Sequence, residues 1–341
     1  MRISLLHPTY WPEVRRGSER FAHDLGKGLA ERGHAVRLLT SHRGRTTRTA
    51  EDGIVVVRHP RAPDGRLRRR LHEDHLAHLP FTYASLRIGG DDVAHALFHT
   101  DALAARRAGV PYVYSFMGVA HRRGLASRRR RAEMVLAAAS GAHATVVLSE
   151  AARRAMRRWL GVDARVIHPG VDLDAFTPGG ERAEELTIVC PAALDAPHKR
   201  APLLLDAFAV VRRRHPSARL VLDARSGVEA PGVELRDLDD HAALVRAYRE
   251  AHVCALASRE EAFGLVLVEA LACGTPAVAA DDAAGPEIAD ATFTGDDPRA
   301  LATAILEAAD QDPAACRERA ERFSIDACVA AHEALYREAL R

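Results

Sequence analysis

The sequence predicts an α/β protein made of two domains, each a parallel sheet covered by helices. Short apolar runs alternate with helical stretches along the chain, as expected of parallel strands joined by crossover helices. The 341 residues are enough for two domains of ordinary size. A Pro- and Gly-rich segment, residues 166–180, separates two series of such elements and is typical of an interdomain linker.

The first series lies before this linker. It begins with an expected strand at Ile3–Pro8 and an expected helix at Ser18–Arg32, which ends at Gly33, a residue suited to terminating a helix. Further strands are expected at the apolar runs Ala35–Thr40, Ile54–His59, Val93–Leu97, Pro111–Phe116 and Ala144–Ser149. The stretches between these runs would supply the covering helices.

The second series repeats the alternation. Strands are expected at Leu186–Pro191, Ala218–Asp223, Val253–Ala257 and Pro276–Ala279. Helices are expected at Arg200–Arg214, His241–Ala251 and Leu265–Cys273, and a last helix at Ile325–Leu340. We therefore predict one Rossmann-like domain over residues 1–168 and a second over residues 169–325.

Basic residues are concentrated in the first half of the chain. Residues 1–170 carry 30 Lys and Arg against 15 Asp and Glu, whereas residues 171–341 carry 18 against 31. Arginine clusters occur at 66–70, 122–123, 128–131 and 153–158. Solvated helix faces explain any single cluster, but together they predict a surface for an anionic partner, either acidic lipid or a phosphorylated acceptor. Nucleic acid is not expected, because the clusters lack a repeated basic–aromatic pattern and a known binding motif.

Several classes of function are disfavoured by what the sequence lacks. No Gly-x-Gly-x-x-Gly follows the first expected strand, and neither a P-loop nor a His-Glu-x-x-His motif occurs. The five cysteines have no Cys-x-x-Cys spacing, so we expect reduced, buried thiols rather than a metal site or a disulfide framework. Without a long apolar run or a signal peptide, a cytoplasmic protein is expected.

The segment that bears most on function is 258–287. It places Glu261 and Glu269 eight positions apart, around a turn that contains Gly264. The apolar run from Leu265 predicts a helix, so Glu261 lies in the loop before it and Glu269 about one turn inside it. The N-terminus of such a helix attracts an anion such as a diphosphate, while the carboxylates suit the hydroxyls of a neutral polyol.

This segment resembles the E-x7-E signature of family 4 of the retaining, nucleotide-sugar-dependent glycosyltransferases. The match includes Glu261-x-Phe263-Gly264-Leu265 and the small-residue run 272–279. The linker at Val166–Asp172 is similar to that of the family as well. The resemblance implies the GT-B fold, with two Rossmann-like domains whose parallel sheets face one another across a cleft. It also implies that the last helix, residues 326–341, crosses back onto the first domain.

The resemblance further implies roles for individual residues. The first domain would bind the acceptor and the second the nucleotide diphosphate sugar. Lys199, which matches the lysine at the first helix of the family's second domain, would neutralise the diphosphate with help from Arg200. Glu269 would hold the ribose hydroxyls. Glu261 and the backbone of Phe263, Gly264 and Leu265 would contact the sugar, so Glu261 and Lys199 are the expected catalytic residues.

A second phosphate contact is implied at the start of the chain. Arg16-Gly17-Ser18-Glu19 resembles the family's Gly-Gly-x-Glu loop, whose backbone N–H groups approach the phosphates, so Gly17 is expected to bind the donor. Arg16 takes the place of the first glycine. The nucleotide sugar would be a substrate, and no cofactor or metal is expected. The Asp-x-Asp pairs at 172–174 and 237–239 are therefore interpreted as chance.

Two departures from the family pattern affect the expected site. Ala193 stands where an arginine usually contacts phosphate, and Met117 stands where a histidine usually contacts the sugar. Arg225 is one candidate to replace the arginine. The nearby histidines that could replace the other contact are His95, His99 and His121, although each alone is more often a surface or satisfied histidine.

The function that these patterns imply is transfer of a sugar, with retention, from a nucleotide diphosphate sugar to a hydroxyl. The basic first half adds the hypothesis of a lipid-linked or otherwise anionic acceptor and of peripheral contact with the acidic inner face of the membrane. Two alternatives stay open. The departures at Met117 and Ala193 would suit a non-catalytic GT-B partner protein, and the fold would also suit a nucleotide-sugar epimerase.

Overall fold

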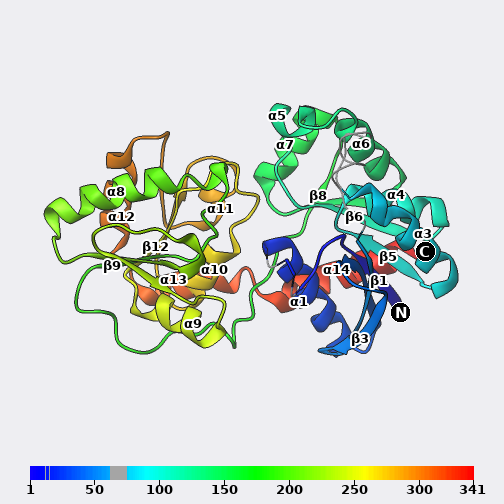
Figure 1. Cartoon of the computed structure of the whole chain (residues 1–341), viewed down its shortest axis with the longest axis horizontal. Helices are drawn as coiled ribbons and strands as arrows, with labels where there is room; N and C mark the ends of the chain where they lie inside the picture. The colour runs from blue at the N-terminus through cyan, green and yellow to red at the C-terminus, as the bar shows by residue number, and fades with distance from the viewer. Residues whose placement is uncertain (12, 15, 62–74) are drawn as a thin grey trace. The chain divides into compact units, whose positions relative to one another are not determined.

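The computed structural model describes residues 1–11, 13–14, 16–61 and 75–341, which divide into two compact units (Figure 1). The first unit comprises Met1–Gly170 and Ile325–Arg341, and the second comprises Val171–Ser324. The expected domain boundaries, after residues 168 and 325, lie within two residues of these limits. The arginine cluster at 66–70 lies outside the described residues.

The first unit is built on a sheet with the strand order β3-β4-β2-β1-β5-β6-β7-β8. Neighbouring strands are parallel except β3 and β4. The strands are β1 (Arg2–Leu6), β2 (Ala35–His42), β3 (Thr47–Glu51), β4 (Ile54–Pro60), β5 (Val93–Ala96), β6 (Tyr112–Phe116), β7 (Ala144–Val147) and β8 (Arg165–Val166). The described helices are α1 (Gly17–Glu31), η1 (Leu76–His78), α3 (Leu79–Gly89), α4 (His99–Ala108), α5 (Arg122–Ala126), α6 (Arg131–Gly141), α7 (Glu150–Leu160) and α14 (Ile325–Ala339).

Helices cover both faces of this sheet because its strands are apolar on both sides. Leu5 of β1 belongs to a core that includes residues of α1 and α14. Leu6, the next residue, belongs to another core formed with α3, α4, α6 and α7. Successive side chains of a strand point to opposite faces, so these two cores lie on opposite sides of the sheet.

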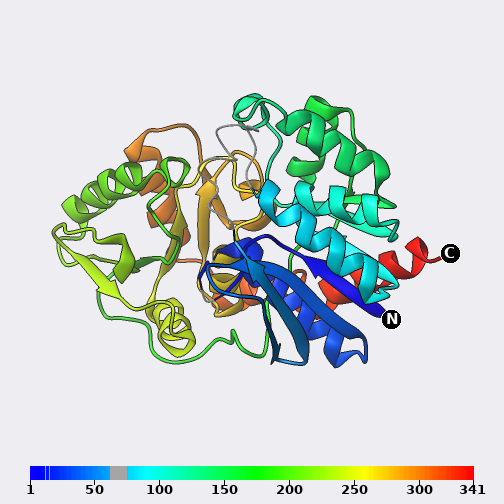
Figure 2. The ribbon, with the colours of Figure 1, turned by 45° about the vertical axis from the view of Figure 1, so that its right-hand side comes forward.

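The last helix of the chain, α14, belongs to the first unit. Figures 1 and 2 both show it (red) beside α1, and it also contacts β6. In the core beneath it, the hydroxyl of Tyr336 lies 2.7 Å from Nδ1 of His95, and Nε2 of His95 lies 2.7 Å from Oγ of Ser115. This buried network connects the end of the chain to β5 and β6.

The second unit is built on a fully parallel sheet with the order β11-β10-β9-β12-β13-β14. Its strands are β9 (Thr187–Cys190), β10 (Arg219–Asp223), β11 (Val233–Arg236), β12 (Val253–Leu256), β13 (Ala277–Ala280) and β14 (Ala291–Phe293). Its helices are η2 (Pro197–Lys199), α8 (Ala201–Arg214), η3 (Ala224–Ser226), α9 (His241–Glu250), α10 (Leu265–Ala272), α11 (Gly285–Ile288), α12 (Pro298–Ala308) and α13 (Pro313–Glu321).

The predicted α/β class with parallel sheets is confirmed, and each strand expected from an apolar run occurs with slightly different ends. The apolar runs do not predict β3, because this edge strand is mostly exposed and carries alternating Thr and Arg. The short strands β8, β11 and β14 were not predicted either. The helix expected from Arg200 begins one residue later, since Arg200 adopts a left-handed conformation with φ 51°.

The cysteines match the expectation of isolated, buried thiols, since all five are free and buried. Among the described residues, no helix is both long and apolar enough to traverse a bilayer.

Candidate functional site

The sheet of the second unit has a point where the chain reverses its direction of winding. The chain goes from β9 to β10 and β11 on one side, and then crosses to β12 on the other side of β9. Open parallel sheets bind ligands outside the carboxyl ends of the strands at such a point. Lys199 follows β9 and Glu261 follows β12, so the topology places both predicted residues at this edge.

Lys199 and Glu261 form an ion pair there. Nζ of Lys199 lies 2.9 Å from Oε2 of Glu261, and about one fifth of each side chain is exposed (21% and 22%). Two backbone hydrogen bonds hold the loops that carry them: Arg259 N–H donates to the carbonyl of His198 (2.8 Å), and Ala284 N–H donates to the carbonyl of Glu261 (3.2 Å). The structure therefore brings together the two residues expected to be catalytic.

The charge of Lys199 also affects its neighbour His198. The pKa of His198 is lowered, first by burial and then by the Lys199 ammonium, although Glu261 and Glu260 oppose the shift. His198 is therefore held in its neutral form near pH 7. A neutral imidazole leaves the ammonium as the positive charge at this end of β9.

Arg200 makes several contacts within the second unit. Its guanidinium donates to the backbone carbonyls of Ala257 and Gly295 and to the carboxylate of Asp296 (2.7 Å). It also lies 5.3 Å from the ring centroid of Phe293. These contacts connect the loops after β12 and β14, so Arg200 holds the loop that carries Glu261, and its help with a diphosphate remains a prediction.

Glu269 lies in the interior of the unit rather than at its surface. The residue is 1% exposed, and Oε2 accepts a hydrogen bond of 2.8 Å from the hydroxyl of Tyr248 on α9. Sequence reasoning placed Glu269 about one turn inside α10, which the structure confirms, but gave no signal for Tyr248. That contact joins residues 21 positions apart and depends on the packing of α9 against α10.

The turn between the two glutamates requires glycine. Gly264 has φ 92°, a left-handed conformation that side chains with a Cβ rarely adopt. A Cβ there would lie 3.1 Å from Cδ1 of Leu267 and 3.4 Å from Cγ of Glu261. Phe263 is buried and packs edge-on against Phe323, with ring centroids 5.4 Å apart. Leu265 then begins α10, so the N-terminus of this helix follows directly after the Glu261 loop.

Arg225, the candidate replacement for the missing arginine, follows a different strand from Ala193, which stands in that arginine's place. Arg225 pairs with Asp223 (2.7 Å) and Asp239 (3.0 Å) in the loop after β10. Ala193 lies just after β9. In the described part of the chain, no three His, Cys, Asp or Glu side chains are grouped so that they could hold a metal ion.

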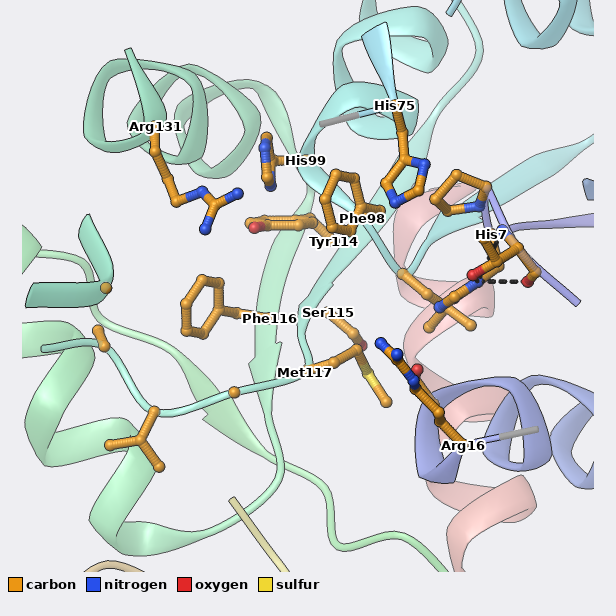
Figure 3. A pocket seen from close by; sticks show the side chains of 18 of the residues that line it. His7, Arg16, His75, Phe98, His99, Tyr114, Ser115, Phe116, Met117 and Arg131 are labelled. Atoms are coloured by element: carbon orange, nitrogen blue, oxygen red, sulfur yellow. Dashed lines mark hydrogen bonds between the residues drawn. The ribbon is translucent and has the colours of Figure 1, made fainter. Parts of the chain in front are cut away.

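The first unit contains a pocket of about 460 Å³ at the carboxyl ends of β1, β5 and β6. This is again the point where the strand order reverses, between β1 and β5. The aromatic side chains of Phe98, Tyr114 and Phe116 line it. Figure 3 shows Arg131 and Arg16 reaching toward it from opposite sides. The pocket thus combines ring faces with two cationic groups, an arrangement suited to a ring-shaped ligand that carries an anion.

The loop that contains Gly17 borders this pocket. Glu19 is buried there and accepts hydrogen bonds from Oγ1 of Thr9 (2.6 Å) and Oγ of Ser18 (2.9 Å). Burial lowers the pKa of His7, and the charge of Glu19 opposes that shift. A Cβ added to Gly17 would meet nothing within 4 Å, so the packing of the unit does not itself require glycine at this position.

Met117 lies in the wall of the same pocket, together with His99 and His121. Two of the three histidines proposed as substitutes are therefore near Met117. His95 is not among the lining residues, since it is fully buried between Tyr336 and Ser115. Sequence reasoning also missed Arg131 as an individual residue, because it is the last member of the 128–131 cluster and nothing in the pattern distinguishes it.

Two solved structures superpose on nearly the whole chain. Sucrose-phosphate synthase from Thermosynechococcus elongatus superposes with a TM-score of 0.79 over 99% of this chain and 98% of that chain, at 21% identity. HepE from Anabaena, solved in complex with UDP-glucose, superposes with a TM-score of 0.70 over 98% of this chain and 99% of that chain, at 18% identity. The chain therefore has the two-domain GT-B architecture of these structures.

Sequence comparison identifies the family. The model described as Glycosyltransferase Family 4 matches residues 15–175, and that described as Glycosyl transferases group 1 matches residues 185–311. A D-inositol 3-phosphate glycosyltransferase from Nocardiopsis dassonvillei is 30% identical over 77% of this chain and 73% of the relative. One from Thermobifida fusca is 31% identical over 77% and 72%. The chain belongs to glycosyltransferase family 4.

Proposed function

We propose that this glycosyltransferase moves a sugar, with retention, from a nucleotide diphosphate sugar to a hydroxyl of the acceptor, in a hexosyltransferase-like reaction that needs no metal ion. The observation that carries the proposal is the 2.9 Å contact between Lys199 and Glu261 at the carboxyl ends of β9 and β12. It supplies a cation for the leaving group and a carboxylate for the sugar at one place.

The transfer breaks the bond between the anomeric carbon and an oxygen of the diphosphate, which gains negative charge as it leaves. The Lys199 ammonium and the N-terminus of α10 would stabilise this charge, as fixed cationic groups do in other transfers. In the retaining reaction proposed here, the leaving phosphate oxygen takes the proton of the acceptor hydroxyl. No protein base is then needed, so Met117 in place of histidine is compatible with turnover.

The remaining donor contacts are also part of the proposal. Glu261 and the backbone of Phe263, Gly264 and Leu265 would contact sugar hydroxyls, and Glu269 would hold the ribose. The bond from Tyr248 supports an oriented Glu269, but the residue is only 1% exposed. Access to a ribose would require a small rearrangement around α10. Gly17 and Arg200 keep their predicted roles, the first near the phosphates and the second assisting Lys199 at the diphosphate.

The acceptor is proposed to be an anionic polyol bound in the pocket of the first unit. Arg16 and Arg131 line this pocket, and Phe98, Tyr114 and Phe116 provide faces for the C–H groups of a ring. The curated relatives are named for inositol 3-phosphate, a phosphorylated cyclitol. A phosphorylated cyclitol or sugar is therefore the first acceptor to test, with a lipid-linked phosphate as the second.

Peripheral contact with an acidic membrane, at the cytoplasmic face, is proposed from the surface of α7. Arg153, Arg154, Arg157 and Arg158 of this helix are exposed, and Trp159 is 41% exposed with the Arg158 guanidinium 5.2 Å from its ring. Arginine beside tryptophan suits the interface of an anionic bilayer. Equal sedimentation with acidic and neutral vesicles would reject this contact.

The decisive experiment measures turnover with UDP-, GDP- and ADP-linked hexoses against a panel of phosphorylated and neutral polyols, with and without EDTA. Lys199→Met should lower kcat/KM at least about 100-fold, as loss of a group that stabilises transition-state charge does. Lys27→Met is the matched control, since Lys27 is the other lysine of the chain and lies on α1. The anomeric configuration of the product, read by NMR, tests retention.

Other outcomes of this experiment would support a different function. Conversion of the donor sugar without any acceptor would indicate an epimerase. Binding of nucleotide without turnover would indicate a non-catalytic partner protein. If Lys199→Met were as active as the parent chain, the proposed donor site at Lys199 would be rejected.

A further inference from the structure

We propose that Glu261 acts in product release, as a counter-ion that returns to Lys199 after transfer and displaces the nucleoside diphosphate. The inference rests on the proposed function, because it takes Lys199 as the ligand of the diphosphate. It gives Glu261 a second task besides contact with the sugar.

The first step is that Lys199 already has an anionic partner in the empty protein. Among the described residues, Glu261 is the one carboxylate that lies within 4.0 Å of Lys199 Nζ. About four fifths of each side chain is covered, so solvent and salt screen this pair less than an exposed one. The backbone bonds of Arg259 to His198 and of Ala284 to Glu261 hold both loops in place.

The second step is that a diphosphate must compete with Glu261 for the same ammonium. Two anions beside one cation repel each other, and at a few ångströms the repulsion is substantial in a partly covered site. Glu260 and Asp195 add to this repulsion. Both carboxylates lie near enough to Lys199's neighbour His198 to raise its pKa. The guanidinium of Arg200 offsets these charges only in part, since it is also bound to Asp296 and to backbone carbonyls.

The third step is that the sugar removes this penalty. When a complete donor is bound, its hydroxyls donate to the Glu261 carboxylate, which then has partners although it has left Lys199. After transfer, the sugar is gone, and the Glu261 carboxylate faces the diphosphate without a hydroxyl that donates a hydrogen bond to it. Return of Glu261 to Lys199 restores the ion pair and favours release. Glu261 thus discriminates against the product and in favour of the donor.

The test compares the dissociation constants of UDP, GDP and ADP, and of their glucose conjugates, for the parent chain and Glu261→Gln by calorimetry. Glutamine keeps the shape and removes the charge. We expect Glu261→Gln to bind the nucleoside diphosphate at least fivefold more tightly and to lose most of its preference for the sugar conjugate. Its product inhibition constant should fall in parallel, while transfer slows.

Glu260→Gln is the matched control, because it removes the neighbouring charge from the same loop without removing the partner of Lys199. It should change the same constants less than twofold, and melting temperatures of both variants establish that they are folded. Unchanged or weaker diphosphate binding by folded Glu261→Gln overturns the inference. Failure of the proposed function has a separate signature, namely that Lys199→Met binds the diphosphate as well as the parent chain does. If none of UDP, GDP and ADP binds to the parent chain or to Glu261→Gln, both proposals are wrong.

Discussion

The hydroxyl of Tyr248 donates a hydrogen bond of 2.8 Å to Oε2 of Glu269 in the interior of the second unit. Glu269 is 1% exposed and Tyr248 fully buried. The backbone carbonyl of Tyr248 in turn accepts a bond of 2.6 Å from Oγ1 of Thr275. The carboxylate is therefore held by Tyr248 of α9, whose backbone is itself bonded to the loop between α10 and β13, and this orients Glu269 without any ligand.

Tyr248→Phe should destabilise the protein by about 1–3 kcal/mol, because it leaves a buried carboxylate oxygen without this donor. Urea denaturation measures the loss. Tyr112→Phe is the control, since the hydroxyl of Tyr112 donates to the neutral carbonyl of Ala138 and should cost about 1 kcal/mol. Equal losses in the two variants would show that Glu269 does not depend on Tyr248.

Gly17→Ala separates a binding role from a packing role. A Cβ at Gly17 meets nothing within 4 Å, and alanine is the better helix former at the start of α1, so stability should be unchanged or raised by up to about 1 kcal/mol. If phosphates approach the Gly17 backbone, the KM for the donor should rise about tenfold, which corresponds to roughly 1.4 kcal/mol. A parent-like KM together with a parent-like melting temperature would exclude this backbone contact.

Gly264→Ala should lower stability and disturb Glu261 together. The left-handed φ of 92° costs about 1–3 kcal/mol with a Cβ present, and that Cβ would crowd Leu267 at 3.1 Å. Gly109→Ala isolates the strain, since Gly109 has φ 74° but its Cβ would meet nothing within 4 Å. We expect Gly264→Ala to lose more stability than Gly109→Ala and also to lose activity. Equal losses in stability would mean that Leu267 adapts without cost.

Acid should weaken the attachment of α14, because burial lowers the pKa of His332 to about 4 and that of His95 well below its usual value. Both groups are favoured as neutral in the folded state. The stability that these two neutral side chains contribute is therefore fully present above pH 6.5 and is lost as the pH falls from 6.5 toward 4. For His332 alone the loss approaches roughly 3 kcal/mol, at about 1.4 kcal/mol per pKa unit.

Urea midpoints at pH 7.5, 6 and 5 measure this dependence. His332→Leu keeps an apolar side chain against Phe21, which contacts His332 with ring centroids 5.8 Å apart, and removes the titrating group. Its midpoint should fall less with acid than that of the parent chain. Parallel slopes in the two proteins would show that His332 does not contribute.

Local patterns were sufficient for much of the fold. Strands such as β9 and β12 are buried on both faces, so they appear as continuous apolar runs, and the helix after Gly264 follows from its apolar residues. Edge strands gave no such signal. The residues of β3 are held by backbone pairing to β4, with side chains that face solvent.

The candidate site divides in the same way. Lys199 and Glu261 could be identified because each stands in a local motif, and their meeting follows from the strand order around β9. Arg200 is in the same motif as Lys199, yet its guanidinium contacts Asp296, 96 positions away. No local sequence pattern predicts this contact.

Local sequence patterns were enough to predict the α/β class, the two series of elements and the position of the two glutamates around a glycine turn. These properties depend on hydrophobic periodicity and backbone preference, which act over a few residues. The folded structure was needed to see that Glu261 pairs with Lys199, that Tyr248 holds a buried Glu269, and that Arg131 lines a pocket with Arg16. The residues of these pairs are 21 to 115 positions apart in the chain. Their proximity depends on how strands and helices pack, which short sequence patterns do not reveal.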